Sequence, residues 1–219
     1  MKMLVVLLAL AIVLVACGQP AECREPGKDD CLLDLAKERN DPRLCNGIDG
    51  AVRAWCFTDL AAQLDDTKVC ANIDDERSAA FCVSNIAETR GDVNLCSAIS
   101  VLSARDKCLH EIGMDNLDAA VCAKISQKAY GDGCIYDIAQ TTLSADSCEL
   151  ITNSSTSFRC LFQMASKKMD ATVCDRLNGE QRDWCITNIA IKSVDGNLCD
   201  TVESGAVRGA CRDGITRRT

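Results

Sequence analysis

Residues 118–142 read DAAVCAKISQKAYGDGCIYDIAQTT, and the spacing of the two cysteines in this stretch recurs along most of the chain. Cys122 and Cys134 are 12 residues apart, and the next cysteine, Cys148, follows 14 residues later. From Cys31 to the last cysteine, steps of 14 residues alternate with steps of 11 or 12. A sequence that repeats with a period of 25 or 26 residues indicates an array of stacked structural units.

Each unit contains a first cysteine, which we call A, and a second cysteine, which we call B. The A cysteines are Cys23, Cys45, Cys70, Cys96, Cys122, Cys148, Cys174 and Cys199. The B cysteines are Cys31, Cys56, Cys82, Cys108, Cys134, Cys160, Cys185 and Cys211. Positions in a unit are counted from these two residues, so that Ile125 is A+3 and Ile135 is B+1.

A short helix is predicted around each A cysteine. In the quoted stretch, Asp118 precedes Cys122 by four residues, and Val121 and Ile125 lie on the cysteine's side of a helix. Aspartate and serine cap helix N-termini with a side-chain oxygen. The residues at A−4 are Asp41, Asp66, Asp92, Asp118, Ser144, Asp170 and Asp195. We therefore expect each short helix to begin there and to span roughly eight residues.

A second helix is predicted around each B cysteine. In the quoted stretch, Ile135, Ile138 and Ala139 follow Cys134 at B+1, B+4 and B+5, which is the apolar stripe of an amphipathic helix. The small residue at B+5 is expected where the next helix crosses most closely. No stretch alternates apolar and polar residues with the period of two that marks a strand. The expected fold is all-α, an α-solenoid of about seven to eight short helical hairpins, each stapled by a disulfide.

Two pairings of the sixteen cysteines are possible. Bonds from each B to the next A would leave Cys23 and Cys211 unpaired, and the strict 14-residue step is compatible with that choice. Bonds from A to B use every cysteine and join antiparallel helices at similar depth from the turn, so we favour A–B bonds. A closed loop of about 12 residues contributes roughly 3 kcal/mol, which would offset the small core of so short a unit. The favoured bonds are Cys23–Cys31, Cys45–Cys56, Cys70–Cys82, Cys96–Cys108, Cys122–Cys134, Cys148–Cys160, Cys174–Cys185 and Cys199–Cys211.

The array resembles secreted cysteine-rich αα-repeat proteins, relatives of the tetratricopeptide repeats in which a disulfide ties the two helices of each repeat. One cysteine per helix and alanine in the apolar stripe carry the resemblance, which covers roughly residues 23–216. The period of 26 residues departs from about 36 in that family. The resemblance implies binding of a protein or peptide partner and transfers no site residue.

The N-terminal residues look like an export signal. One lysine, Lys2, precedes an apolar run over residues 4–15, which as a helix would reach about 18 Å and fall short of a ~30 Å bilayer core. The sequence Leu14-Val15-Ala16-Cys17 resembles the lipobox of prokaryotic lipoproteins, which implies a diacylated Cys17. The predicted organisation is a signal peptide (1–16), a lipidated cysteine with a tether (17–22), the repeat array (23–211) and a C-terminal tail (212–219).

Charge and cysteine content limit the classes of function. Without residues 1–16, which hold one lysine, the chain carries 23 basic and 32 acidic side chains and a formal charge of −9. Such a chain is unsuited to nucleic acid or to a polybasic grip on anionic lipid. Besides Cys17, sixteen cysteines lie in the roughly 200 residues that follow, about 8%, which is typical of an exported disulfide scaffold.

Metal, haem and catalytic sites are not expected. No two cysteines of the array are closer than eight residues, and Cys17 lies six residues before the first of them, so the zinc and haem motifs with closely spaced cysteines are missing. The single histidine, His110, is expected at the surface of a helix. No cofactor, metal ligand or catalytic residue is assigned, and the chain is not expected to be an enzyme.

Three sets of residues remain as surface candidates. Polar residues at B+3 form either an acidic row for a cation or, as we favour, local contacts to loops and water: Asp34, Asp59, Asn85, Glu111, Asp137, Gln163 and Asn188. Arginines at B−3 are expected to form salt bridges with that row: Arg53, Arg105, Arg182 and Arg208. Aromatic residues at B−1 are expected to pack on the core, with an exposed binding patch as the alternative: Trp55, Phe81 and Trp184.

The sequence therefore predicts an exported lipoprotein, anchored through Cys17 to the outer face of the cell membrane or in the periplasm or outer membrane. Its expected role is that of a scaffold for an unknown protein or peptide partner. A thiol–disulfide or metal-handling protein of the cell envelope is the alternative. A hydrolase is a third hypothesis, for which no site is visible in the sequence.

Overall fold

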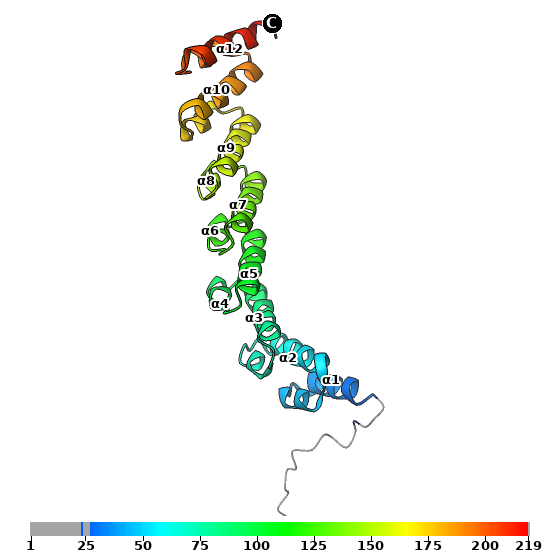
Figure 1. The fold of residues 1–219 in the computed structure, drawn as a ribbon. Helices are drawn as coiled ribbons and strands as arrows, with labels where there is room; N and C mark the ends of the chain where they lie inside the picture. The colour runs from blue at the N-terminus through cyan, green and yellow to red at the C-terminus, as the bar shows by residue number, and fades with distance from the viewer. Residues whose placement is uncertain (1–22, 24–26, 219) are drawn as a thin grey trace, which may run out of the picture. The chain divides into compact units, whose positions relative to one another are not determined.

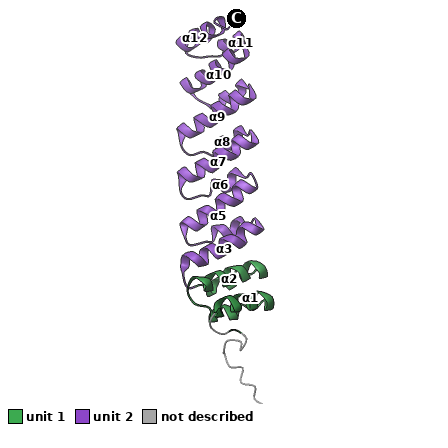
Figure 2. Ribbon diagram, turned by 90° about the vertical axis from the view of Figure 1, so that its right-hand side faces the viewer, with its two compact units in different colours: residues 1–73 green, residues 74–219 purple. Residues whose placement is uncertain are grey.

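The computed structural model describes Cys23 and residues 27–218, and this part of the chain is built of helices and turns without a strand. It contains two compact units, Met1–Ile73 and Asp74–Thr219, which Figure 2 colours green and purple. The predicted all-α array of tandem helical hairpins is thus confirmed. The predicted signal peptide, Cys17 and the tether to residue 22 lie outside the described residues.

Unit 1 contains α1 (Lys28–Arg39), the 3₁₀ helix η1 (Pro42–Gly47), α2 (Gly50–Leu64) and the 3₁₀ helix η2 (Val69–Asn72). Leu32 of α1 and Phe57 and Leu60 of α2 are almost fully buried and form its core. At the far end of the two helices, Gln63 Nε2 donates to the backbone oxygen of Lys37 at 3.1 Å. Both the apolar stripes and this polar contact hold α1 against α2.

Unit 2 is a row of long helices with a short helix beside each junction, as Figure 1 shows from α3 to α12. Each long helix contacts the next long helix along the chain. The long helices are α3 (Glu76–Arg90), α5 (Leu102–Asp115), α7 (Lys128–Thr142), α9 (Ser154–Lys168), α10 (Gly179–Ser193) and α12 (Gly205–Thr216). The short helices are α4 (Val93–Ser97), α6 (Ala119–Cys122), α8 (Ala145–Cys148), η3 (Ala171–Arg176) and α11 (Gly196–Asp200).

The apolar stripe predicted for the long helices forms the core of unit 2. In α7 the exposed fraction is 2% or less at Cys134, Ile135, Ile138 and Ala139, which are positions B, B+1, B+4 and B+5. One hydrophobic cluster extends from Ala80 to Val207, so that successive repeats share a continuous core. This is the arrangement expected when a repeat cannot bury its apolar face alone.

The small residue at B+5 lies where the following short helix approaches, as predicted. A Cβ atom added to Gly113 of α5 would come within 2.7 Å of Cys122 Sγ in α6. In α3, α7, α9 and α10 this position is a fully buried alanine, and in α12 it is Thr216. Side-chain size at B+5 therefore sets how closely each short helix packs on the preceding long one.

The short helices are shorter than the predicted eight residues. They contain four to six residues, and η1, η2 and η3 have 3₁₀ geometry. The aliphatic residue at A+3 is buried but lies outside the helix after η1 and η3. There, Ile48 and Leu177 have a β-type backbone conformation, with ψ of 144° and 162°. The chain must turn directly after A because B returns antiparallel only 11 or 12 residues later.

Six of the seven predicted N-cap residues cap a short helix, and Asp66 makes the same kind of bond one turn before η2. Asp118 accepts from the backbone N–H of Ala120 at 2.9 Å, and Asp66 accepts from that of Lys68 at 2.9 Å. Asp170 accepts from both the backbone N–H and the hydroxyl of Thr172. These hydrogen bonds hold the pKa of Asp170 below its ordinary value.

The long helices end in a tight reversal that feeds the next short helix. In α7, Leu143 adopts the left-handed conformation at φ 54°, and the N–H of Ser144 donates to the oxygen of Ala139 at 3.1 Å. This is the six-to-one bond of a Schellman motif, which usually places glycine in the left-handed position. The same reversal at Gly91 uses glycine, whereas Met169 and Val194 adopt it with large side chains.

The disulfides connect A to B within each hairpin, as favoured from the sequence. Eight cysteine pairs lie at disulfide distance, and Cα–Cα distances such as 5.8 Å for Cys122–Cys134 and 5.6 Å for Cys148–Cys160 are ordinary for this bond. Cys70 and Cys82 are disulfide-bonded as well. Disulfides at this density indicate an oxidising, extracytoplasmic location. Within the described ranges, no helix has both the length and the apolar character needed to cross a bilayer.

Candidate protein-binding face

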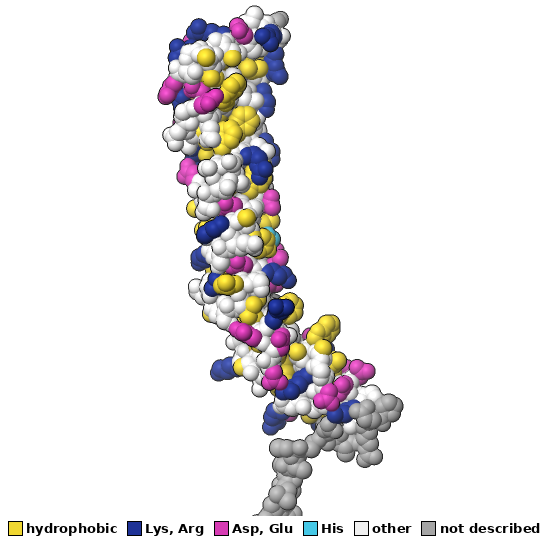
Figure 3. Space-filling view, viewed as in Figure 1, with side chains coloured by type: hydrophobic (Ala, Val, Ile, Leu, Met, Phe, Trp, Pro, Cys, Tyr) yellow, Lys and Arg dark blue, Asp and Glu magenta, His cyan; other side chains and the backbone are white. Residues whose placement is uncertain are grey.

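The outer face of the long helices carries the candidate surface residues, some in unit 1 and most in unit 2. Positions B−1 and B+3 lie on the side of each long helix opposite the buried stripe, so equivalent side chains form rows across successive repeats. Figure 3 shows one side of the molecule, on which basic, acidic and apolar side chains are interspersed. Among the described residues, this side of the molecule therefore carries no continuous patch of a single charge (Figure 3), and the residue at each position changes from repeat to repeat.

The aromatic residues at B−1 are exposed, so the prediction that they pack on the core is wrong. The exposed fraction is 72% at Trp55, 49% at Phe81 and 47% at Trp184. The Lys107 Nζ atom lies 5.7 Å from the centre of the Phe81 ring, and Trp184 Nε1 donates to Glu180 at 3.1 Å. B−1 faces outward because B, B+1 and B+4 already fill the interior stripe. The alternative, an exposed aromatic surface, is what the structure shows.

Three of the polar residues at B+3, Asp59, Gln163 and Asn188, contact the neighbouring long helix, whereas Asp34 and Asp137 are exposed to water, as favoured from the sequence. Tyr136 Oη donates to Gln163 Oε1 at 2.6 Å, and Asn188 Nδ2 donates to Ser166 Oγ at 3.1 Å. In unit 1, Asp59 pairs with Lys37 at 2.6 Å. Across residues 23 and 27–218, no group of three or more His, Cys, Asp or Glu residues is placed to hold a metal ion.

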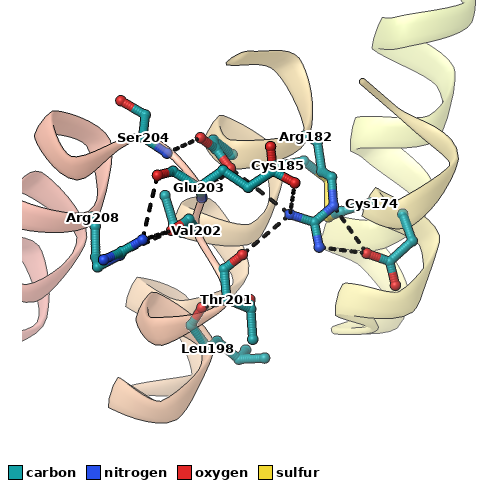
Figure 4. Close-up of polar contacts among 11 residues, drawn as sticks. Cys174, Arg182, Cys185, Leu198, Thr201, Val202, Glu203, Ser204 and Arg208 are labelled. Carbon is teal, nitrogen blue, oxygen red and sulfur yellow. Dashed lines mark hydrogen bonds and ion pairs between the residues drawn. A yellow bond between two sulfur atoms is a disulfide. The ribbon is translucent and has the colours of Figure 1, made fainter. Parts of the chain in front are cut away.

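Arg105, Arg182 and Arg208 at B−3 contact the loop that precedes the next long helix or the loop of their own repeat, so for these three the predicted salt bridges with the B+3 row are wrong. Arg182 donates to Asp175 and to the backbone oxygen of Thr201, and Arg208 donates to the backbone oxygen of Val202 at 2.7 Å (Figure 4). Arg105 donates to Ser126 Oγ. The guanidinium lies one turn before B and faces the loop rather than B+3.

Three buried aspartates at B−2, which sequence reasoning missed, join successive repeats. Asp106, Asp132 and Asp183 are 6%, 5% and 3% exposed. Asp183 accepts from the backbone N–H of Glu203 at 2.9 Å and from that of Ser204 at 2.8 Å, and Figure 4 shows these donors in the loop before α12. Asp106 and Asp132 make the same two-donor contact 20 and 21 residues further on. The recurrence of aspartate at B−2, which Asp29 shares, was the signal that would have revealed them.

A polar pocket of about 470 Å³ lies between the N-terminal halves of α7 and α9. Lys128 and Gly133 line it from α7, Arg159 lines it from α9, and Thr152 and Asn153 line it from the preceding loop. Asp132 also lines the pocket, but both of its oxygens accept from Thr152 and Asn153. The Arg159 guanidinium lies 4.8 Å from the centre of the Tyr136 ring.

His110 is half-buried rather than free at the surface. Its ring stacks on Tyr130 of the next long helix, with centroids 4.6 Å apart and planes 9° from parallel. Burial raises the pKa of Tyr130, and the nearby carboxylates of Glu111 and Asp106 raise it further. The stack joins α5 to α7 in the same way as the other contacts between neighbouring long helices.

Comparisons of the chain with protein-family models, with curated proteins and with solved structures found no match. The function is therefore argued from the exposed face itself.

Proposed function

We propose that this protein is an extracytoplasmic scaffold that binds a protein or peptide along the outer face of its long helices, without catalysis. The observation that supports the proposal is the exposure of the aromatic residues at B−1, with Phe81 and Trp184 about half exposed. Large aromatic side chains are enriched in protein interfaces because they bury much area with little loss of conformational entropy. A monomer would gain stability by burying them, so their exposure favours a role in binding.

The disulfides support a structural role for the sixteen cysteines of the array. All of them are disulfide-bonded, and fifteen of the sixteen are buried. A thiol–disulfide enzyme needs an accessible thiolate, and a reactive cysteine sits in a partly exposed, electropositive environment. The arrangement therefore favours the binding scaffold over the thiol–disulfide alternative.

The proposal includes a lipid anchor on Cys17, which would hold the array at the outer face of the cell membrane or in the periplasm or outer membrane. Two acyl chains give stable attachment where a single chain is marginal. We expect the wild-type chain to incorporate labelled palmitate and to sediment with membranes, and Cys17→Ser to do neither. A wild-type chain that takes up no label would contradict the anchor and leave the binding role to be judged separately.

Site-specific photo-crosslinking in cells tests the binding role. A benzophenone amino acid at Phe81 or Trp184 is expected to yield a discrete crosslinked partner. The matched control is the same amino acid at Lys124, which is exposed beyond the short helix α6 and is expected to yield none. Crosslinks from Lys124 alone, or from no position on the outer face, would refute the proposal.

A further inference from the structure

The B−1 row in unit 2 has a regular order. From α3 to α10 it reads Phe81, Lys107, Gly133, Arg159 and Trp184, that is, aromatic, cation, gap, cation, aromatic, and Ala210 follows in α12. Neighbouring helix axes are about 8–10 Å apart, and three residues of extended chain cover about the same length. An extended peptide that crosses the long helices would therefore present one side chain in three to each repeat.

Gly133 opens the middle of this row, and packing does not require it. A Cβ atom added to Gly133 meets nothing within 4 Å, whereas one added to Gly131 would come within 3.0 Å of the Cys122 oxygen. Glycine inside a helix is unfavourable relative to alanine. Gly131 is thus explained by the approach of α6, but Gly133 is not, and its visible effect is to keep the pocket open.

The pocket beside Gly133 has unused hydrogen-bond donors and positive charge. Of the residues that the structure describes, none forms an ion pair with Lys128 or Arg159, although both line the pocket. Asn153 uses Oδ1 to cap α9 through the N–H of Thr156 at 3.0 Å, and its Nδ2 has no partner within the described part of the chain. The one carboxylate there, Asp132, already accepts from three donors, the N–H and the hydroxyl of Thr152 and the N–H of Asn153.

Such a set of donors fits a carboxylate. Charge-assisted hydrogen bonds from lysine, arginine and amide donors to a carboxylate are stronger than neutral ones. Both cations stand out because the whole chain has a formal charge of −8. The negative charge of an aspartate or glutamate side chain of a partner would therefore be balanced here by Lys128 and Arg159, whereas the chain as a whole is acidic.

We propose that this row binds an extended acidic peptide segment of a partner protein, with a carboxylate in the pocket between Lys128 and Arg159 and an apolar side chain on Trp184. This inference rests on the proposed function and names its partner class and its site. Charge complementarity selects an acidic segment over a basic one. The exposed rings of Phe81 and Trp184 select apolar residues at the two ends of the segment, four repeats apart.

The test uses the full chain with its disulfides intact and a fluorescent 13-residue peptide that carries glutamate at every third position and leucine at each end. We expect saturable binding that weakens as salt rises, because exposed charges are screened beyond about 8 Å at physiological ionic strength. The same peptide with glutamine in place of glutamate is expected to bind at least about tenfold more weakly. Equal binding of the two peptides would overturn the proposal.

Matched variants locate the site. Gly133→Leu fills the pocket and is expected to weaken binding about tenfold, whereas Gly209→Leu, at a helical glycine of α12 that also has free space around it, is expected to leave it within twofold. Arg159→Glu is expected to weaken binding more than tenfold, and Arg217→Glu, directly after α12, is expected to change it little. If the two glycine variants, or the two arginine variants, weakened binding equally, the peptide would not bind at the pocket beside Gly133.

Two further outcomes separate this inference from the proposed function. If glutarate displaces the peptide with an affinity equal to that of the peptide, the pocket binds a free small carboxylate, and the proposal of a peptide ligand is wrong. Photo-crosslinks from Phe81 and Trp184 that persist in Gly133→Leu would keep the scaffold function and overturn the acidic site. Loss of those crosslinks in Gly133→Leu but not in Gly209→Leu would support both.

Discussion

Val194, Met169, Leu143 and Leu117 adopt the left-handed backbone conformation, with φ between 53° and 56°, and leave their side chains 41–45% exposed. Each lies at B+9, where the long helix reverses into the next short helix. For residues other than glycine this conformation is unfavourable by about 1–2 kcal/mol. The reversal is therefore imposed by the repeat geometry and not by the residue that occupies it.

Val194→Gly is expected to raise the free energy of unfolding by about 0.5–1 kcal/mol, because relief of strain exceeds the extra entropy of glycine in the unfolded chain. Urea unfolding followed by circular dichroism measures the change. Gly91→Ala, at the equivalent reversal with φ 63°, is the opposite change and is expected to be destabilising. If Val194→Gly lowered stability, the valine side chain would be making a contact that outweighs its strain.

Asp170→Ala tests the N-cap at a residue whose pKa is lowered in the folded state by hydrogen bonds from Thr172. The unfolded chain binds the proton more tightly, so the stabilisation is present above the ordinary aspartate pKa of about 3.9 and is lost as pH falls through the lower folded value. We expect a loss of about 1 kcal/mol at pH 7 that shrinks below pH 4. Asp170→Asn, which caps without titrating, should show no such pH dependence, and a constant deficit for Asp170→Ala down to pH 2 would contradict the argument.

At this scale the sequence predicted what repeats in every unit. The caps at A−4 and the small residue at B+5 were visible because seven copies share them. Residues that serve one junction were not predictable: Leu143 gives no signal for a left-handed turn, and the outward direction of Trp184 depends on which face of the helix is already filled.

The buried aspartates at B−2 act at the scale of elements, because each fixes the loop before the next long helix. Asp183 accepts two backbone N–H groups that have no place in a helix ladder. Asp183→Ala removes the buried acceptor of both N–H groups, which is expected to lower the free energy of unfolding by about 1–3 kcal/mol. Hydrogen exchange should accelerate at the amides of Glu203 and Ser204.

Asp137→Ala is the matched control for that change, since Asp137 is an exposed aspartate of a long helix and its loss is expected to alter stability by less than about 0.5 kcal/mol. Equal effects of the two substitutions would mean that the buried contacts contribute no more than surface charge. Asp183→Asn should fall between them, because an amide offers one acceptor oxygen instead of two.

The elements themselves were largely predictable, and the reason is periodicity. Apolar residues at B+1 and B+4 fixed the buried stripe of each long helix, and the caps fixed where each short helix begins. The ends of the short helices were not predictable, because Ile48 and Leu177 satisfy a helical spacing while their backbone is already extended. Ile48 and Leu177 are buried, and the packing that buries them depends on the neighbouring repeat, which the spacing within one repeat does not reveal.

For the molecule as a whole, the cysteines replace a large core. The long helices have 12–15 residues and the short ones four to six, so each repeat buries few side chains, and only eight aromatic residues other than histidine are present in the chain. A closed loop of about 12 residues contributes roughly 3 kcal/mol, comparable to a good part of the 5–15 kcal/mol that stabilises a whole domain. Without its disulfides the array should therefore not remain folded.

Stepwise reduction tests this dependence. Fifteen of the sixteen cysteines are buried, and the exception is Cys31 in α1, which is partly exposed. Thiol reagents should therefore open Cys23–Cys31 first, with little change in the helical circular dichroism signal. The remaining bonds should be reduced only as repeats open, and the helical signal should fall with them, as partial alkylation followed by mass spectrometry would record. An array that keeps its helical signal after all eight bonds are reduced would show that packing alone holds the repeats. Equal reduction rates for Cys23–Cys31 and the interior bonds would show that burial does not protect them.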